Sequence, residues 1–210
     1  MSVTKLLAIS LGAILTNNFI FSQFLGICPF LGVSKKSDTA VGMGLAVTFV
    51  MGLASAFCYG VNIILVKLGL GYMQTVAFIL VVASLVQFIE MFLKKSMPTL
   101  YTALGVYLPL ITTNCCVLGV TILAVQDYTK VYEAQGFGMA YAEALICAAG
   151  AGVGFLVAML LFCGVRSRVE AANPPESFKG LPITLVSAAI TSMSFMGFGG
   201  LVENIINAIF

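Results

Sequence analysis

The sequence contains no histidine and few charged residues. The absence of histidine excludes zinc sites of the Cys/His type, a histidine general base and a haem with a histidine ligand. Ten Lys and Arg residues against eight Asp and Glu residues give a net charge of only +2, so no basic surface is available for nucleic acid. Hydrophobic residues make up 60% of the 210 residues, and the mean hydropathy is +1.10. This composition indicates a membrane protein rather than a soluble one.

Apolar runs long enough to cross a hydrocarbon core, which takes roughly 20 helical residues, occur six times. They lie at 6–33, 39–66, 71–93, 99–124, 137–163 and 181–206. Charged and turn-forming residues fill the linkers at 34–38, 67–71, 94–98, 126–136 and 166–180. No linker is long enough for a soluble domain, so we expect one all-α membrane domain over residues 1–210.

The distribution of Lys and Arg predicts the orientation of this domain. Seven of these residues lie in the linkers after the first, third and fifth runs. The remaining linkers and the chain ends carry three. Because short cytoplasmic loops are enriched in Lys and Arg, the first group of linkers is expected to face the cytoplasm. Both termini are then expected on the outer side.

Two segments of the chain resemble each other and indicate an internal repeat. Residues 26–33 and 113–120 share the pattern Cys-x-x-Leu-Gly-Val, which aligns Cys28 with Cys115. A Gly-x-Gly pair at 42 and 44 matches another at 152 and 154. The repeats are expected at about 1–95 and 96–210, with three spans each. Because three is odd, the second copy must enter the membrane from the opposite face, as an inverted repeat.

The first and fourth spans are expected to be broken helices. Asn17, Asn18 and Pro29 interrupt the first, while Pro109 and Asn114 interrupt the fourth. Polar groups and prolines at such depth are tolerated where they face protein or a cavity. Inverted symmetry would then bring breaks near Cys28 and Cys115 toward each other from opposite faces.

The six cysteines fall into different groups. Three lie in apolar helical stretches without polar neighbours and are expected to be packing residues, namely Cys58, Cys147 and Cys163. Cys28 and Cys115 allow a neutral thiol, a metal ligand or a disulfide. Two cysteines cannot complete a four-thiolate zinc or iron–sulfur site, so a metal would require further ligands from a second protein chain. The side chain of Cys116 should point in a different direction from that of Cys115.

Several polar residues within the spans are candidates for an ion path. Asn18, Thr113 and Asn114 could line such a path or donate hydrogen bonds to sulfur, or they could satisfy the backbone of a broken helix. A transporter would use intramembrane groups such as Gln87, Glu90 and Glu143. The residues alone therefore leave open a secondary transporter, a redox subunit and a non-redox membrane scaffold.

Four sequence segments resemble one family of membrane subunits. They read NN at 17–18, SQFLGICPFLG at 22–32, LPLITTNC at 108–115 and FMGF at 195–198. These motifs are similar to those of the family that includes RnfA of the Rnf complex and NqrE of the sodium-pumping NADH:quinone reductase Nqr. The first motif is closer to Rnf, and the resemblance extends over nearly the whole chain.

The resemblance implies a component of a bacterial cytoplasmic (inner) membrane enzyme that moves electrons between ferredoxin and NAD+ while translocating Na+ or H+. It implies six helices in two inverted repeats, a homologous sister protein, RnfE, of opposite topology, and the further partners RnfB, RnfC, RnfD and RnfG. Carried over to this chain, Cys28 and Cys115 would supply half the ligands of a 2Fe-2S cluster shared with RnfE. The family usually has a small residue where this chain has Cys116, but the repeat aligns Cys115 with Cys28.

Overall fold

The computed structural model describes residues 9–16, 18–34, 37–96, 110–111, 114–135, 137–172, 174–198 and 204. Every regular element among these residues is helical, which confirms the predicted all-α fold. The elements are η1 (Gly12–Thr16), α2 (Ile27–Val33), α3 (Ser37–Lys67), η2 (Gly71–Met73), α4 (Gln74–Ser96), α7 (Cys115–Gln135), α8 (Phe137–Ala171), η3 (Glu176–Phe178) and α9 (Leu181–Met196).

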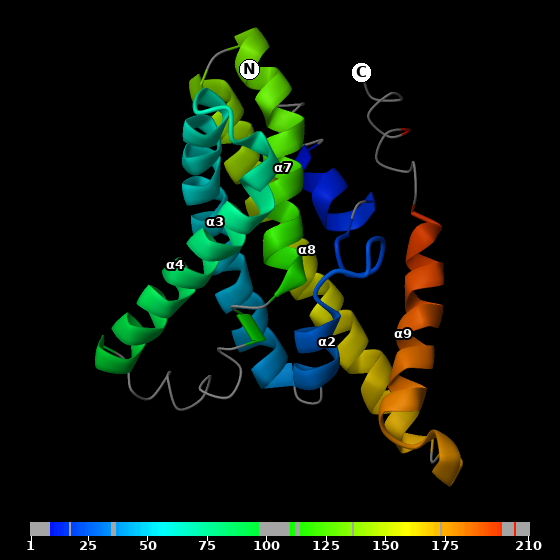
Figure 1. Ribbon diagram of the computed structural model, residues 1–210. Helices are drawn as coiled ribbons and strands as arrows, with labels where there is room; N and C mark the ends of the chain where they lie inside the picture. Colours follow the sequence, from blue (N-terminus) through cyan, green and yellow to red (C-terminus); the bar gives the residue numbers. More distant parts are fainter. Residues whose placement is uncertain are drawn as a thin grey trace.

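Helices α3 and α8 form the centre of the molecule and pack against each other more extensively than any other pair (Figure 1). Small residues allow their close approach. A methyl group on Gly44 would lie 3.2 Å from the Cα of Leu156, and one on Gly152 would lie 2.8 Å from the Cα of Thr48. The glycine belongs to α3 in the first contact and to α8 in the second. The contact positions rise along α3 as they fall along α8, so the two helices run antiparallel.

The remaining helices repeat one order on either side of this central pair. A helix that begins after a non-helical residue, a long central helix and a peripheral helix follow one another twice, as α2, α3 and α4 and then as α7, α8 and α9. Helix α4 packs on α3, and α9 packs on α8. In Figure 1, α4 and α9 run in opposite directions, as do α3 and α8. This arrangement is the one that an inverted repeat predicts.

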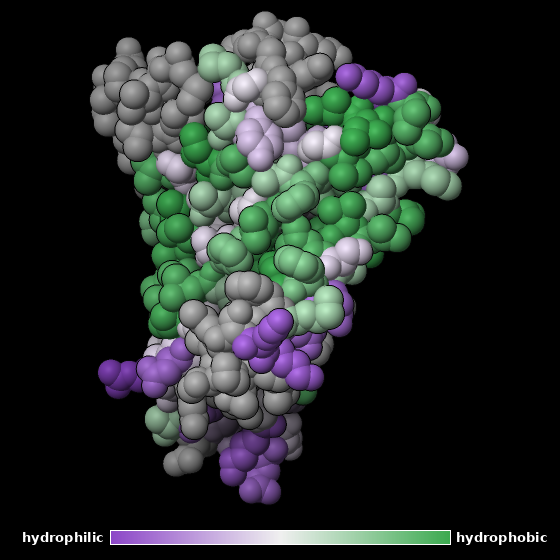
Figure 2. Space-filling model, turned by 90° about the vertical axis from the view of Figure 1, so that its left-hand side faces the viewer, coloured by the Kyte–Doolittle hydropathy of each residue, from purple (hydrophilic) through white to green (hydrophobic). Residues whose placement is uncertain are grey.

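The surface confirms a membrane protein. Among the described residues, three helices are long and apolar enough to cross a membrane, at Ser37–Lys67, Gly71–Met91 and Gly138–Ala171, and shorter apolar helices lie at Cys115–Gln126 and Leu181–Met196. Figure 2 shows a broad hydrophobic band over the α4 side, with hydrophilic residues gathered below it and at its upper edge. Large apolar side chains of α4, such as Leu80 and Phe88, are exposed.

Two helices continue into regions that were expected to be linkers. Helix α7 extends to Gln135 through the predicted linker at 126–136, and α8 extends to Ala171 through the first part of the linker at 166–180. Neither extension contains Gly or Pro before Gly136 and Pro174. An established helix gains one hydrogen bond for each residue added, so polar residues alone do not end it. Of the run expected at 99–124, residues 99–109 and 112–113 lie outside the described residues.

The first expected span is broken, as predicted, but the break precedes Cys28 rather than lying at it. Helical structure at η1 gives way to turns over Asn18–Gly26, and the short helix α2 follows. Pro29 lies in the first turn of α2, where a missing backbone N–H is tolerated. Cys28 is therefore held on a helix, not in the irregular segment.

Candidate functional site

The break in the first span is held in place by the side chain of Asn18, which is 1% exposed. Its Nδ2 donates to the carbonyl oxygens of Ile14, at 3.1 Å, and Gly154, at 2.9 Å. Its Oδ1 accepts hydrogen bonds from the backbone N–H groups of Ile20, at 3.1 Å, and Phe21, at 3.4 Å. One amide thus satisfies backbone groups in η1 and in the turns that follow it, and it ties the segment to α8, as buried polar groups require.

Further contacts fix the same segment between α8 and α9. The hydroxyl of Ser192 in α9 donates to the carbonyl oxygen of Phe21. The ring centroid of Phe21 lies 4.7 Å from that of Phe195 in α9, and the ring of Phe30 in α2 stacks on Phe162 in α8 at 4.2 Å. These aromatic contacts add packing energy to the hydrogen bonds. The broken first span is therefore a well-anchored structure.

The break in the second repeat lies at Asn114, immediately before α7. Its Oδ1 accepts a hydrogen bond from the backbone N–H of Cys116 at 3.0 Å, and its carbonyl oxygen accepts one from Val117 at 3.1 Å. Asn114 thus acts as a cap for the first turn of α7. The residue is 3% exposed, and its Nδ2 has no hydrogen-bond partner among the described residues.

The two breaks meet at Gly26. This glycine has φ +81°, in the left-handed region, and it precedes the first residue of α2. A methyl group on Gly26 would lie 2.9 Å from the Cβ of Cys116 and 3.0 Å from Oδ1 of Asn114. Only glycine therefore suits both this backbone conformation and this contact. The segments that carry Cys28 and Cys115 are in direct contact, and in Figure 1 the start of α7 lies beside α2.

The structure separates the cysteines by exposure. Cys28 and Cys115 are exposed, whereas Cys116 and Cys58 are fully buried and Cys147 and Cys163 are half-buried. Exposure of Cys115 and burial of Cys116 agree with the expectation that these neighbours point in different directions. Among the described residues, no group of three or more His, Cys, Asp or Glu side chains could hold a metal ion. The two exposed thiols, Cys28 and Cys115, are half the number of ligands that a four-thiolate site requires.

The other predicted polar residues lie in different environments. Glu143 is buried in α8 with 1% exposure, Glu90 is half-buried in α4, and Gln87 is exposed. Thr113 lies outside the described residues. Among the described polar candidates, Asn18 and Asn114 are the ones that border the breaks near Cys28 and Cys115.

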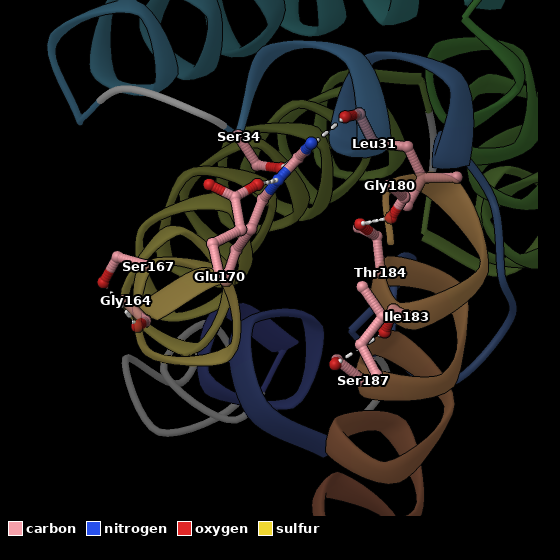
Figure 3. Close-up of polar contacts among 10 residues, drawn as sticks. Leu31, Ser34, Gly164, Ser167, Glu170, Gly180, Ile183, Thr184 and Ser187 are labelled. Carbon is pink, nitrogen blue, oxygen red and sulfur yellow. Dashed lines mark hydrogen bonds and ion pairs between the residues drawn. The ribbon is translucent and has the colours of Figure 1, made fainter. Parts of the chain in front are cut away.

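Sequence reasoning missed Arg166, which the structure connects to α2. Its Nη1 donates to the carbonyl oxygen of Leu31 at 2.6 Å and to the hydroxyl of Ser34 at 2.9 Å. Its Nε donates to Glu170 one helical turn later, at 2.9 Å. In the sequence Arg166 belonged to an expected cytoplasmic linker. It instead reaches from α8 to the end of α2, and Figure 3 labels its partners Leu31, Ser34 and Glu170.

Comparison with known proteins identifies the family. The family model described as "Rnf-Nqr subunit, membrane protein" matches residues 6–202. The chain belongs to the Rnf-Nqr family of membrane proteins. This membership confirms the resemblance carried by the motifs around Cys28 and Cys115.

Members of the Rnf-Nqr family with high similarity share nearly the full length of the chain. One is the A subunit of the Na(+)-translocating ferredoxin:NAD(+) oxidoreductase complex of Acetobacterium woodii, which is 52% identical over 93% of this chain and 97% of its own. The A subunits of the ion-translocating oxidoreductase complexes of Syntrophotalea carbinolica and Aeromonas hydrophila subsp. hydrophila are 48% and 46% identical. They match 94% and 96% of this chain and 98% and 100% of their own, respectively.

Proposed function

We propose that this chain is RnfA of an Rnf-type complex that transfers electrons between ferredoxin and NAD+ and translocates Na+ or H+. Within it, Cys28 and Cys115 supply half the ligands of a 2Fe-2S cluster, and the homologous RnfE supplies the other half. RnfB, RnfC, RnfD and RnfG complete the complex. The full-length similarity to A subunits of ion-translocating oxidoreductases supports membership of such a complex.

One observation carries the assignment of the cysteines. Two broken helices from opposite repeats touch at Gly26 and Cys116, and on each of these segments one cysteine is exposed. Two thiolates exposed within a membrane would be costly, whereas a metal centre completed by a second protein chain would neutralise their charge. The burial of Cys116 favours Cys115 as the ligand from the second repeat.

The residues around the two thiols fit such a site. When bound, a 2Fe-2S cluster supplies a one-electron carrier between the soluble partners of the complex. Asn114 holds the first turn of α7 and has a buried Nδ2 available to donate to a sulfur atom. Phe30 and Val117, each two residues after one of the two cysteines, are buried, so water is excluded from that side of each segment. Hydrogen bonding and burial of this kind tune reduction potentials.

Ion coupling follows from electrostatics in a low-dielectric medium. An electron held between Cys28 and Cys115 adds negative charge within the membrane, and a cation entering nearby offsets it. Electron transfer would thereby bias the two inverted repeats between outward and inward openings. The chain lies in the bacterial cytoplasmic membrane with the linkers near Lys94 and Arg168 in the cytoplasm and both termini outside.

Low-temperature EPR with iron and sulfide analysis tests the assignment on the assembled complex in membranes. Cys28→Ser and Cys115→Ser should each remove one two-iron signal while the other components stay assembled. Cys163→Ser, on the half-buried face of α8, is the matched control and should keep the signal. Unchanged iron content and spectrum in both ligand variants would overturn the proposal.

A secondary transporter is the alternative that one observation favours. Glu143 is a carboxylate with 1% exposure inside an apolar helix, and such groups mark ion or proton pathways. A transporter should move its ion without iron and should tolerate Cys28→Ser. Ion uptake by vesicles that contain the Cys28→Ser complex therefore distinguishes the two functions.

A further inference from the structure

Arg166 is a charged side chain that the fold buries. It lies in α8 and is 6% exposed. Its ionic partner Glu170 is 55% exposed, so the pair is not a closed, buried ion pair. Burial of a guanidinium group is costly unless its donors are satisfied. Arg166 donates mainly to the end of α2, namely to Leu31 and to Ser34, the residue that follows the helix; Figure 3 labels both partners.

The contact lies at the carboxyl end of α2. The last carbonyl groups of any helix lack partners within the helix. Arg166 donates a hydrogen bond to the carbonyl oxygen of Leu31. The hydroxyl of Thr39 donates one to the carbonyl oxygen of Val33 at 3.3 Å. A cation at this end also interacts favourably with the aligned peptide dipoles. Arg166 is therefore a cap for α2 supplied by a helix from the other repeat.

Helix α2 depends on such contacts for its direction. It has seven residues, and a helix of that length is not stable by itself in the absence of tertiary packing. Cys28 is in its first turn, three residues before Leu31, which corresponds to about 4.5 Å along the helix. A rotation or tilt of α2 at its capped end would therefore move the sulfur of Cys28.

We propose that Arg166 is a positioning residue for electron transfer: it fixes α2 so that Cys28 presents its sulfur correctly, and its charge favours an added electron there. This role rests on the proposed function of Cys28 as a cluster ligand. A neutral cap could satisfy the carbonyl of Leu31, but only a cation also stabilises negative charge at this depth. The charge and the two hydrogen bonds therefore make separable contributions.

The test uses three variants in the assembled complex in membranes. Arg166→Gln removes the charge and the two-pronged contact, Arg166→Lys keeps the charge alone, and Ser34→Ala removes one acceptor. The exposed Arg168→Gln, two residues later on the same helix, is the matched control. The readouts are the amount of assembled chain, the two-iron EPR signal per assembled chain, its line shape and its midpoint potential.

Arg166→Gln should reduce the signal per assembled chain by roughly tenfold, as loss of hydrogen bonds from a charged donor predicts. Its residual signal should titrate at a more negative potential. Arg166→Lys should restore the potential but not the line shape, and Ser34→Ala should change the line shape without a change in potential. Arg168→Gln should match the wild type. A potential that is the same in Arg166→Gln as in the control would overturn the role of the charge.

Failure of this proposal differs from failure of the proposed function. Loss of the signal in Cys28→Ser, together with unchanged line shapes in Arg166→Lys and Ser34→Ala, would overturn only the positioning role. A signal that persists in Cys28→Ser would overturn the cluster assignment itself. If Arg166→Gln does not accumulate in the membrane, Arg166→Lys and Ser34→Ala decide the question, because the first keeps the charge and the second keeps the hydrogen bond to Leu31.

Discussion

The breaks in the two repeats each contain a buried asparagine, but the two amides are used differently. Asn18 has both of its polar atoms engaged, with carbonyl oxygens accepting from Nδ2 and backbone N–H groups donating to Oδ1. Asn114 uses only Oδ1, which caps the first turn of α7. Its Nδ2 has no partner in the part of the chain that the structure describes.

This difference separates an anchoring residue from one with a spare donor. Buried polar atoms without partners are rare because each costs free energy. The hydrogen bonds of Asn18 within the chain offset the cost of its burial. The structure of the first break therefore explains why an asparagine is buried there. Asn114 retains a donor that the described part of the chain does not use, beside the exposed Cys115. A group that lies outside the described residues would account for that donor.

The largest expected effect comes from removing the engaged asparagine. Asn18→Ala leaves two backbone N–H groups and the carbonyl of Gly154 without their partner in a buried segment. With roughly 1–3 kcal/mol for each of these three buried groups left unsatisfied, the total loss should be at least about 3 kcal/mol. The thermal denaturation midpoint of the purified complex measures this loss.

Asn114→Ala is the matched change in the other repeat. It removes a single cap, which is worth about 1 kcal/mol, and it also removes a buried donor that lacks a partner among the described residues. The denaturation midpoint should therefore fall much less than in Asn18→Ala. Equal losses for the two alanine variants would mean that the two amides do not differ as the hydrogen bonds indicate.

Gly26→Ala should produce the next largest effect, because Gly26 joins the two breaks. A left-handed conformation costs an L-residue about 1–2 kcal/mol, and here the new methyl group would also meet Cys116. We expect a destabilisation of about 2–4 kcal/mol, since overpacking adds about 1–3 kcal/mol and neighbouring side chains relax part of it. The cluster signal should weaken as well, because the two cysteine segments separate.

Gly69→Ala is the control that measures only the free-energy cost of a left-handed backbone conformation. Gly69 has φ +71°, close to that of Gly26, and nothing lies within 4 Å of its potential methyl group. Its destabilisation should be only about 1–2 kcal/mol, with no change in the EPR signal. If both variants lose the same stability and keep the same signal, the contact between the breaks does not matter for the site.

The sequence predicted the main features of this comparison but not their details. Asn, Pro and Gly at membrane depth disfavour a continuous helix, so both breaks were predictable from residue type. The start of α2 after Gly26 was not, since it depends on a left-handed glycine packed against Cys116. The extension of α7 to Gln135 was missed because polarity was taken as a sign of a linker.

Long-range contacts account for the part of the site that the sequence could not predict. The bonds from Arg166 to Leu31 and from Asn18 to Gly154 join residues more than 130 positions apart. No local pattern marks either pair. The alignment of Cys28 with Cys115 can be read from the sequence because their motif recurs, whereas a cap supplied by a distant helix leaves no periodic signal.

Cys116→Ala should have a smaller effect and sharpens the contrast between the neighbouring cysteines. Cys116 is fully buried against Gly26, so the change removes a small packed group and should cost about 1 kcal/mol. The two-iron signal should remain at the wild-type level. Cys115→Ala, in the same complex, should abolish the signal with little loss of stability, because Cys115 is exposed. The reverse result would make Cys116 the ligand.

The smallest effect should come from removing only the spare donor of Asn114. Asn114→Ser keeps an oxygen that can cap the N–H of Cys116 but removes the Nδ2 donor. Hydrogen bonds to sulfur favour the reduced form of an iron–sulfur site, so their loss lowers its reduction potential. A hydrogen bond of about 1 kcal/mol corresponds to a shift on the order of 40 mV for one electron. Redox titration followed by EPR measures this shift.

Asn62→Ser, at a buried asparagine in the last turns of α3, is the matched control and should leave the potential unchanged. An unchanged potential in Asn114→Ser would mean that its donor serves a group other than sulfur, such as the translocated ion's hydration water.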